Sequence, residues 1–434
     1  MSRASLALRE TWQPICDALG AVDLEHPAPE LPRLCEQAFR DAQVDTASAR
    51  YFGVPHGHPS EAAIEGAAMS ARHNPELASR HHAPFAVAAE RKLVRAFAAR
   101  FYGDDRDAGG IVTGGASEAV LSALLAALAR KAPAFPKRGL HAFAKPPRVY
   151  ASIDAHPSIL KAVRATGLGD EALRWVTCDS AQRMSLPALA QAIGNDRRDA
   201  TPVFVVATAG TTTSGSFDPL PGVAEIAERD GCFLHVDAAY GGMLALLDRA
   251  HAEIAGIDRA DSIAFDPHKT LPVPLGLGLL LMKAPALLAR VFAVPARYVP
   301  RTHEEPWATS LPWSRGFRGL PLLLEIAKRG FGGLRAAIEH KLALGGLLRE
   351  KLLARGFAVT NESPLPVVCF VDASSSRGRT AKHLAELAIR ARKEAGAFVS
   401  LVRMPDGSPV LRATITSDAT TVGDLDALVL ALRP

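Results

Sequence analysis

The middle of the sequence alternates short apolar runs with helical segments. Five runs read as strands, namely RVYASID, PVFVVATAG, CFLHVDAA, SIAFD and GLGLLLMK. Between them, HPSILKAVRATG and LPGVAEIAERDG read as helices, each ending at a glycine that suits a helix C-cap. Apolar strands that alternate with helices predict a mostly parallel sheet with helices on both faces. Polar residues that follow such strands should gather at the carboxyl edge of the sheet.

The flanking regions predict two further parts. Residues 1–60 read as amphipathic helices followed by a loop, YFGVPHGHPSEAA, whose proline, glycine and histidine content resists regular structure. Residues 61–300 form the predicted large domain. Residues 301–434 contain a long helical stretch and then an α+β pattern, with PVVCFVDA and VLRATIT as strands. TTVGD is a capping signal for the last helix.

Composition excludes several classes of protein. The 434 residues include 50 basic and 45 acidic ones without a long basic run, which argues against a nucleic-acid partner. The 5 cysteines form no CxxC pair, so we expect neither a disulfide framework nor a metal site, and a reducing cytoplasm fits best. The first residues lack a signal-peptide pattern, and the apolar stretches are too short to span a bilayer. We therefore expect a cytoplasmic protein with no membrane partner.

Small residues lead into a helix at IVTGGASEAVLSALLAAL. Backbone N–H groups at a helix N-terminus carry a partial positive charge and can hold a phosphate. Gly115 and Ala116 permit close approach, and Ser117 adds a hydroxyl. A dinucleotide-binding turn would have a further glycine near Val120, and none is present. A tight turn without a ligand is the structural alternative for this motif alone.

Three polar features follow the next strands. His156 comes after one strand and before a helix that Ser158 is expected to help cap. Four threonines, among them Thr208 and Thr212, end another strand, where they either accept a ligand or build the turn. Asp237 lies inside an apolar strand, where a carboxylate is costly without a cationic partner. A buried arginine or a capping role is the alternative for this aspartate.

The segment DPHK contains the most reactive candidate. Lys269, near the end of a strand, can lose its proton through desolvation and act as a nucleophile toward an aldehyde. Each of these motifs alone is only weakly specific for a function. Their order along the chain, from phosphate turn to histidine, threonines, aspartate and lysine, is much more specific.

With these residues assembled, the chain resembles the group II pyridoxal-phosphate-dependent decarboxylases. GGASEA, DAHPS, ATAGTT, HVDAAYGG and DPHK match that family in order, and PWSRGFRGLPL, IEH and LRATITS match its later segments. The resemblance implies the fold type I architecture of aspartate aminotransferase. That architecture has a large domain with a mostly parallel seven-stranded sheet, a small C-terminal α+β domain and a short N-terminal helical segment. It also implies a homodimer with shared active sites.

The resemblance implies a role for each motif residue. Lys269 would carry pyridoxal 5′-phosphate as a Schiff base, and Asp237 would keep the pyridine nitrogen protonated. His156 would stack on the ring. Gly115, Ala116 and Ser117 would hold the phosphate, and the remaining members of the pocket would be Thr208, Thr212, Asp266 and His268.

The implied reaction is α-decarboxylation of an L-amino acid, in which the ring absorbs the electrons of the broken bond and a quinonoid is then protonated. Many relatives carry a mobile-loop tyrosine for that protonation, whereas no tyrosine follows Tyr298 here. Tyr298 or His303 is then a substitute, or the carbanion is oxidised to an aldehyde. A carbon–carbon lyase of the sphingosine-phosphate type and a non-catalytic scaffold are further alternatives. In a second departure, Thr270 follows the lysine where many relatives carry a large residue.

The loop YFGVPHGHPS matches the position of the family's substrate loop. Its candidates for substrate contact are Tyr51, Phe52, His56 and His58, and the alternative is a loop packed at the dimer boundary. We expect Arg315 and Arg318 to form structural ion pairs or dimer contacts. In an aminotransferase an arginine of the C-terminal domain binds the substrate carboxylate, but the family match favours a structural role for Arg412.

Overall fold

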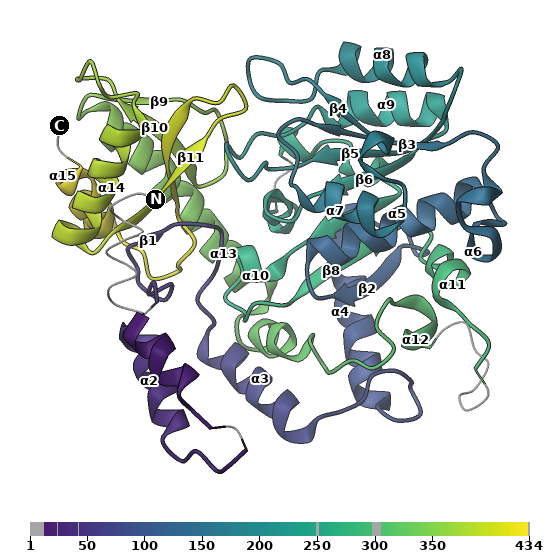
Figure 1. The fold of residues 1–434 in the computed structure, drawn as a ribbon, viewed down its shortest axis with the longest axis horizontal. Helices are drawn as coiled ribbons and strands as arrows, with labels where there is room; N and C mark the ends of the chain where they lie inside the picture. Colours follow the sequence, from purple (N-terminus) through teal and green to yellow (C-terminus); the bar gives the residue numbers. More distant parts are fainter. Residues whose placement is uncertain (1–12, 24, 42, 249–250, 297–304, 433–434) are drawn as a thin grey trace.

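The computed structural model describes residues 13–23, 25–41, 43–248, 251–296 and 305–432. Figure 1 shows a large part built around one sheet and a smaller part, at the left, built around another, with helix α13 running between them. The predicted division at residues 60 and 300 stays a prediction.

The large sheet has seven strands in the order β2-β8-β7-β6-β5-β3-β4. Strands β4, β3, β5, β6 and β7 run parallel, and β8 is antiparallel to both of its neighbours. This confirms the mostly parallel seven-stranded sheet. The strands are β2 (Gly109–Thr113), β3 (Pro147–Ser152), β4 (Leu173–Val176), β5 (Thr201–Thr208), β6 (Phe233–Asp237), β7 (Ser262–Phe265) and β8 (Gly278–Met282).

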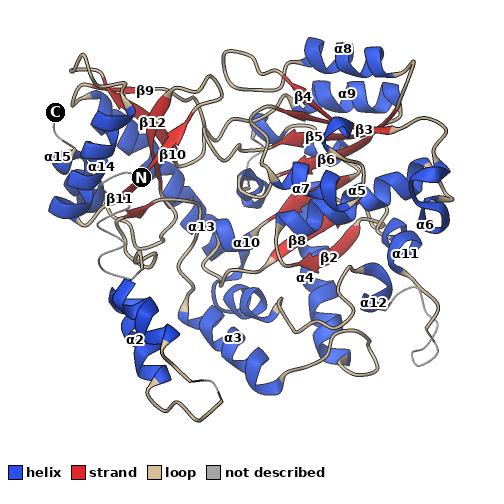
Figure 2. Ribbon diagram, viewed as in Figure 1, coloured by secondary structure: helices blue, strands red, loops and turns tan. Residues whose placement is uncertain are grey.

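Helices cover both faces of this sheet, as Figure 2 shows. Strands β6, β7 and β8 are buried along their whole length, because neither face of a covered parallel sheet meets water. One face carries α5 (Ala116–Lys131), α7 (Ser158–Ala165) and α11 (Ala286–Phe292). The other carries α4 (Pro84–Tyr102), α8 (Leu186–Asp196) and α9 (Leu220–Asp230). Gly231 caps α9 in the left-handed conformation, as the sequence predicts.

The small sheet has five strands in the order β1-β11-β12-β10-β9, antiparallel except for β1 beside β11. Strand β1 (Tyr51–Phe52) comes from the N-terminal loop that we expected to lack regular structure. It pairs in parallel with β11, and the rings of the register partners Tyr51 and Phe398 stack at a centroid distance of 5.4 Å. The other strands are β9 (Phe357–Val359), β10 (Val367–Asp372), β11 (Phe398–Arg403) and β12 (Pro409–Thr414).

The remaining helices connect or flank the two sheets. Residues 13–20 are helical, as is α2 (Leu31–Asp41). Helix α13 (Leu320–Leu353) is interrupted at Gly330, whose φ of 62° favours glycine. Thr421 and Asp424 form the predicted capping box of the last helix, α15. The others are α3 (Glu61–His73), α6 (Phe135–Arg138), α10 (Pro267–Thr270), α12 (Pro306–Thr309), α14 (Ala381–Ala395) and α15 (Val422–Ala431). Short 3₁₀ helices are η1 (Gly139–Ala142), η2 (Asp170–Ala172), η3 (Gly241–Leu246), η4 (Ala252–Ile254) and η5 (Ile257–Arg259).

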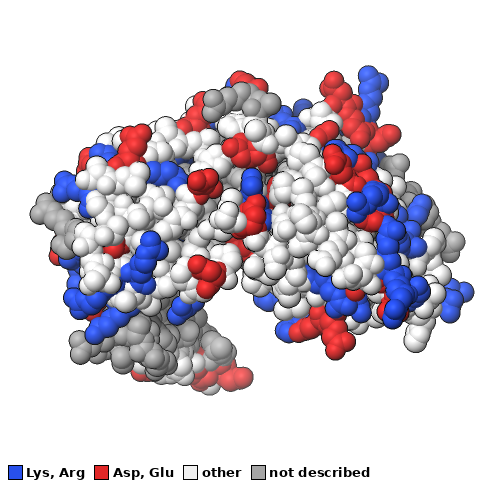
Figure 3. Space-filling view, turned by 90° about the horizontal axis from the view of Figure 1, so that it is seen from above, with Lys and Arg blue, Asp and Glu red and all other residues white. Residues whose placement is uncertain are grey.

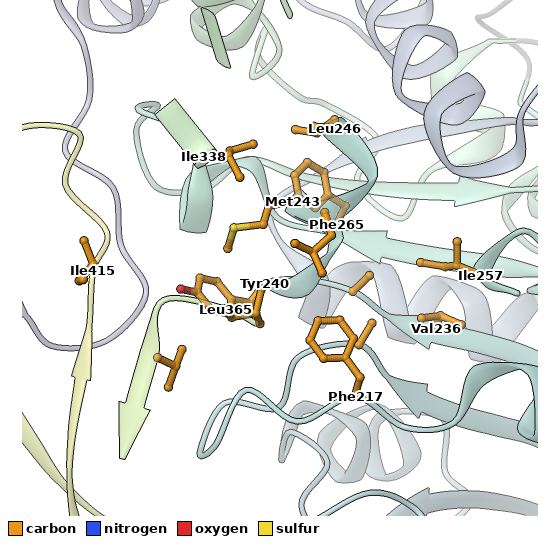
Figure 4. Close-up of a cluster of buried hydrophobic side chains, with 14 of the residues drawn as sticks. Phe217, Val236, Tyr240, Met243, Leu246, Ile257, Phe265, Ile338, Leu365 and Ile415 are labelled. Atoms are coloured by element: carbon orange, nitrogen blue, oxygen red, sulfur yellow. The ribbon is translucent and has the colours of Figure 1, made fainter. Parts of the chain in front are cut away.

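One hydrophobic core extends across both parts. Figure 4 shows Phe265 of β7 and Phe217 in the same cluster as Ile338 of α13, Leu365 and Ile415. Phe265 is fully buried, and burial of such a side chain contributes roughly 1.5–3 kcal/mol. The small sheet therefore rests on the large one through apolar contacts, which fixes what it presents to the carboxyl edge of the large sheet.

The surface carries both signs of charge. On the face drawn in Figure 3, acidic and basic side chains both occur, and the face is hollowed between the two parts. Within the described ranges, no single helix is long and apolar enough to cross a membrane, although the bent pair Ala116–Lys131 and Phe135–Ala142 passes by length and composition. Helix α5 buries ten of its side chains within the protein.

Candidate active site

A cavity of about 460 Å³ lies at the carboxyl edge of the large sheet. All ten residues predicted for the cofactor line it, and they reach it from the ends of β5, β6 and β7 and the starts of α5 and α7. Its lining consists of Gly114, Gly115, Ala116, Ser117, Glu118, His156, Thr208, Gly210, Thr212, Asp237, Ala239, Tyr240, Asp266, His268 and Lys269. A larger cavity of about 720 Å³ lies between α4, β2 and α11 and contains none of the predicted residues. The smaller cavity is the candidate site because the reactive side chains meet there.

Lys269 lies on α10, the single helical turn that follows β7. Its Nζ is 3.1 Å from Oδ2 of Asp266, and its side chain stays partly accessible. Burial raises the pKa of Asp266, and the Lys269 ammonium offsets part of that rise. His268 donates from Nδ1 to the Leu277 carbonyl at 2.6 Å. The lysine amine is thus held at the cavity wall by a carboxylate.

Asp237 is the last residue of β6, between β5 and β7. It is 8% exposed, and its Oδ1 accepts the N–H of Ala239 at 3.1 Å. Its partner across the ladder is Thr208, the last residue of β5. Parallel pairing therefore brings two strand ends, and their polar side chains, to the same edge of the cavity.

The N-terminus of α5 forms another wall. Gly115 precedes it with a φ of +147°, and no side chain caps the helix. The Gly114 N–H donates to Glu118 at 2.8 Å, and Arg318 lies 3.5 Å from the same carboxylate. Because Glu118 is engaged in this way, the first turn still presents backbone N–H groups at a helix N-terminus, which suits an anion.

His156 follows β3 and faces the cavity. Its Nδ1 accepts the Ser158 N–H at 3.2 Å and contacts the Ser158 hydroxyl at 2.8 Å. The sequence predicts that Ser158 helps to cap α7, and this is wrong. Its side chain contacts and orients His156 instead. Burial lowers the pKa of His156, while Asp237 acts in the opposite direction. The lowered pKa favours the neutral imidazole, and an Nδ1 that accepts the Ser158 N–H is consistent with a proton on Nε2.

The threonines that follow β5 have different surroundings. Thr208 and Thr212 line the cavity, whereas Thr211 bonds Ser214 at 2.9 Å and serves the turn itself. Asp218 accepts the Thr208 N–H at 2.7 Å and so fixes the end of β5. The turn role is thus confirmed for Thr211, whereas a ligand-binding role for Thr208 and Thr212 stays a prediction.

Three buried polar atoms of residues that line the cavity make no hydrogen bond within the protein, namely Oγ1 of Thr208, the hydroxyl of Tyr240 and Oδ1 of Asp266. Such atoms are costly unless a ligand satisfies them. Together with the uncapped N-terminus of α5 and the lysine amine, they fit a group that carries a phosphate, an aldehyde and a polar ring. Among the described residues, no group of three or more histidines, cysteines or carboxylates is arranged for a metal ion.

The sequence interpretation missed several lining residues, above all Tyr240 and Gly210. Tyr240 is buried, and its hydroxyl makes no hydrogen bond; Figure 4 shows it pointing away from η3 toward Ile415. Gly210 has a φ of +91°, and a Cβ there would lie 2.8 Å from Leu365. Both lie within motifs that were recognised, HVDAAYGG and ATAGTT, so the signal was in the sequence.

The four substrate candidates are not among the cavity lining. Phe52 is 0% exposed in the core, and the Tyr51 hydroxyl accepts the Val54 N–H. Phe52 therefore offers no surface to a substrate. Burial lowers the pKa of His56, and charge on nearby His268 and His58 lowers it further. For the two histidines, contact with substrate remains a prediction.

Arginines join the site to its surroundings. Arg412 of β12 is 3% exposed and donates from Nη1 to the Thr212 carbonyl at 2.5 Å. Arg315 pairs with buried Glu90 at 2.9 Å, and Arg318 with Glu118. These contacts agree with the structural roles that the sequence predicts. Tyr298 and His303, the proposed substitutes for the loop tyrosine, lie outside the described residues.

Comparison with known proteins gives a consistent result. The model of the pyridoxal-dependent decarboxylase conserved domain matches residues 84–372. Human cysteine sulfinic acid decarboxylase is 30% identical over 410 residues, covering 90% of this chain and 82% of that protein. Tryptophan decarboxylase 2 of Oryza sativa subsp. japonica is 28% identical over 369 residues, covering 80% and 73%. A crystal structure of mouse CSAD in apo form superimposes with a TM-score of 0.87 at 25% identity, covering 96% of this chain and 90% of that one.

Proposed function

Because this chain belongs to the pyridoxal-dependent decarboxylase family, we propose that it removes the α-carboxylate of an L-amino acid as CO2 at the Lys269 cavity. The family consists of lyases that depend on pyridoxal 5′-phosphate. The observation that carries the proposal is the meeting of Lys269, Asp237 and the N-terminus of α5 in one cavity.

Lys269 would hold the cofactor through its amine, and Gly115, Ala116 and Ser117 would hold the phosphate through backbone N–H groups and one hydroxyl. Thr208, Thr212, Asp266 and His268 would complete the binding site, since each lines the same cavity. When bound, pyridoxal 5′-phosphate supplies an aldehyde and an electron-accepting ring for reactions at the α-carbon of an amino acid.

Asp237 and His156 would have complementary roles. The buried carboxylate of Asp237, at the end of β6, would keep a proton on the ring nitrogen of the cofactor and would thereby increase the ring's capacity to accept electrons. The neutral imidazole of His156 offers an aromatic surface and an Nε2 proton without adding a charge. The carboxylate of Asp266 would receive a proton from the Lys269 ammonium at 3.1 Å more readily because burial raises the pKa of Asp266.

The decisive test is Lys269→Ala in the full chain, with Lys283→Ala, a lysine just past the end of β8, as the matched control. We expect Lys269→Ala to abolish the visible absorption of the bound cofactor and to lower CO2 release on the order of 10³-fold or more. The control should keep both. An unchanged absorption spectrum in Lys269→Ala would contradict the proposal.

The substrate is to be identified with a panel of L-amino acids that includes cysteine sulfinate and tryptophan. These two are named for relatives of similar identity, 30% and 28%, so neither is preferred by the comparisons. Release of CO2 together with the matching amine is the expected result for one member of the panel.

A second candidate is decarboxylation coupled to oxidation by dioxygen, in which the amino acid, dioxygen and water give an aldehyde, CO2, ammonia and hydrogen peroxide. The observation that favours it is that no tyrosine follows Tyr298 in the chain. Measuring peroxide beside CO2 and amine in the same panel distinguishes the two: peroxide in proportion to CO2 supports oxidation, and amine in that proportion supports simple decarboxylation.

We also propose that the protein is a homodimer in a reducing compartment. Helix α2 buries none of its residues within the chain, and Phe85 is 72% exposed, so apolar surface is left for a second copy. All 5 cysteines are free. Light scattering after gel filtration should give twice the mass of 46.0 kDa.

A further inference from the structure

The backbone around Lys269 is held through three carbonyls. The His268 carbonyl accepts the Gly57 N–H at 3.4 Å, and the Pro272 carbonyl accepts the Ser60 N–H at 2.9 Å. Between them, the Thr270 carbonyl accepts from Nζ of Lys341 at 3.0 Å. Two of these donors are backbone groups of one loop, and the third is a side chain from α13.

Lys341 is buried, at 2% exposure. A buried ammonium is unfavourable unless it is paired and hydrogen-bonded. Its partner is Asp418, 2.6 Å away, in the segment between β12 and α15. Lys341 therefore donates one hydrogen bond to Thr270, the residue after Lys269, and another to Asp418 in the small part of the molecule.

The ion pair continues into a larger network. Asp418 also accepts from Arg329 at 2.7 Å, and Arg329 pairs with Glu325 at 2.7 Å. Glu325 is fully buried and accepts a short hydrogen bond from the Ser60 hydroxyl. The network contains two cations and two carboxylates, and it returns through Ser60 to the same backbone that Lys341 holds.

Helix α10 depends on such support. It has four residues, and a single helical turn is not stable by itself, so tertiary contacts set its orientation. A site residue 1 Å out of place loses much of its function, and supporting hydrogen bonds prevent this.

We propose that Lys341 is a positioning residue for Lys269. Its ammonium bridges the Thr270 carbonyl and the Asp418 carboxylate, and so fixes the position of α10 relative to the small sheet. The inference rests on the proposed function, since it takes Lys269 to be the cofactor lysine. It assigns Lys341 no contact with cofactor or substrate.

The test uses Lys341→Met in the full chain loaded with pyridoxal 5′-phosphate. The readouts are the dissociation constant of the cofactor, the ratio of visible circular dichroism to absorbance of the bound cofactor, and the thermal midpoint. We expect the dissociation constant to rise about tenfold, as for loss of one coupled contact in a network, and the ratio to fall. Lys341→Arg, which keeps the charge, should restore most of both.

The matched control is Lys351→Met, on the same helix, where the lysine pairs with Asp426 at 2.5 Å away from the site. It should leave the dissociation constant and the ratio unchanged. If Lys341→Met lowers only the thermal midpoint, its role is structural and the proposal is overturned.

If Lys341→Met does not fold, Asp418→Asn tests the same link with less change in volume, and a dissociation constant equal to wild type overturns the proposal. Failure of the proposed function looks different, because the wild-type protein itself would then show no cofactor band, or Lys269→Ala would retain it.

Discussion

Three aspartates around the large sheet and three in the small part have pKa values shifted in opposite directions. Around the large sheet, burial raises the pKa of Asp154, Asp218 and Asp266, in Asp218 to about 6. Backbone N–H donors to Asp218 and hydroxyl donors to Asp154 lower the pKa by less than burial raises it. The charge of Lys269 likewise offsets only part of the rise in the pKa of Asp266. In these three aspartates the partners therefore do not outweigh the effect of burial on the pKa.

In the small part, burial also opposes the charge of Asp372, Asp418 and Asp424, but partners outweigh it and the pKa of each is lowered. The partners are His383 and Ser374 for Asp372, Lys341 and Arg329 for Asp418, and Arg50 and Thr421 for Asp424. The difference teaches that these three aspartates are held by charged or hydroxyl partners, whereas at the cavity Asp266 keeps an oxygen without a hydrogen-bond partner.

The largest expected effect contrasts two strand ends. Asp237 ends β6 at the cavity, and Asp372 ends β10 in the small sheet. Asp237→Asn should lower the rate of CO2 release about a thousandfold, because a contact pair with a ring nitrogen is worth ~4 kcal/mol. The assay uses saturating cofactor, with Asp372→Asn as the matched substitution. A loss below tenfold for Asp237→Asn would remove the contrast.

A second effect is a pH dependence of stability. The raised pKa of Asp218 means that the folded state binds a proton between about pH 4 and pH 6 that the unfolded state does not. Stability from this group is therefore gained as pH falls through that window, by up to about 3 kcal/mol. Buried His235, with its pKa lowered to about 4, contributes the opposite slope, so the two must be separated by a variant.

Asp218→Asn is that variant, because the amide does not titrate. Urea unfolding at pH 4.5 and pH 7 should show that wild type gains stability relative to the variant on acidification. A difference that is constant with pH would mean that burial does not govern this carboxylate.

A third effect is that Asp372→Asn should lower the free energy of unfolding without lowering the rate of CO2 release. The carboxylate accepts from Ser374 Oγ at 2.6 Å and from His383 at 2.8 Å, and hydrogen bonds to a charged group contribute about 1.5–3 kcal/mol. The free energy of unfolding should fall by that order, while CO2 release stays within twofold of wild type. Because the lowered pKa of Asp372 stabilises the fold above about pH 4, this deficit should shrink as pH falls below that value.

The smallest effect concerns helix α15, far from the cavity. Thr421→Ala removes a capping box in which Thr421 and Asp424 bond each other's backbone, at a cost of about 1 kcal/mol. Thermal unfolding measures it, and cofactor absorption should be unchanged. A spectral change here would show that the small part influences the site more widely than through Arg412 and Lys341.

Much of the large sheet and its site could be predicted from local patterns. The apolar runs gave five of its strands, and the residues that follow them, including Lys269, Asp237 and His156, meet in one cavity. The predictions for individual side chains were wrong where tertiary packing sets the orientation or burial of the side chain. Ser158 orients His156 and does not cap a helix, and Phe52 is in the core.

What the sequence by itself determined is the order of reactive side chains along parallel strands, because such strands bring their carboxyl ends to one edge whatever surrounds them. Only the tertiary structure decided which distant groups support that edge. Arg412 reaches the Thr212 carbonyl across 200 positions of the chain, and Lys341 reaches Thr270 across 71. No local pattern encodes these contacts, since they exist only once the small sheet has packed against the shared core.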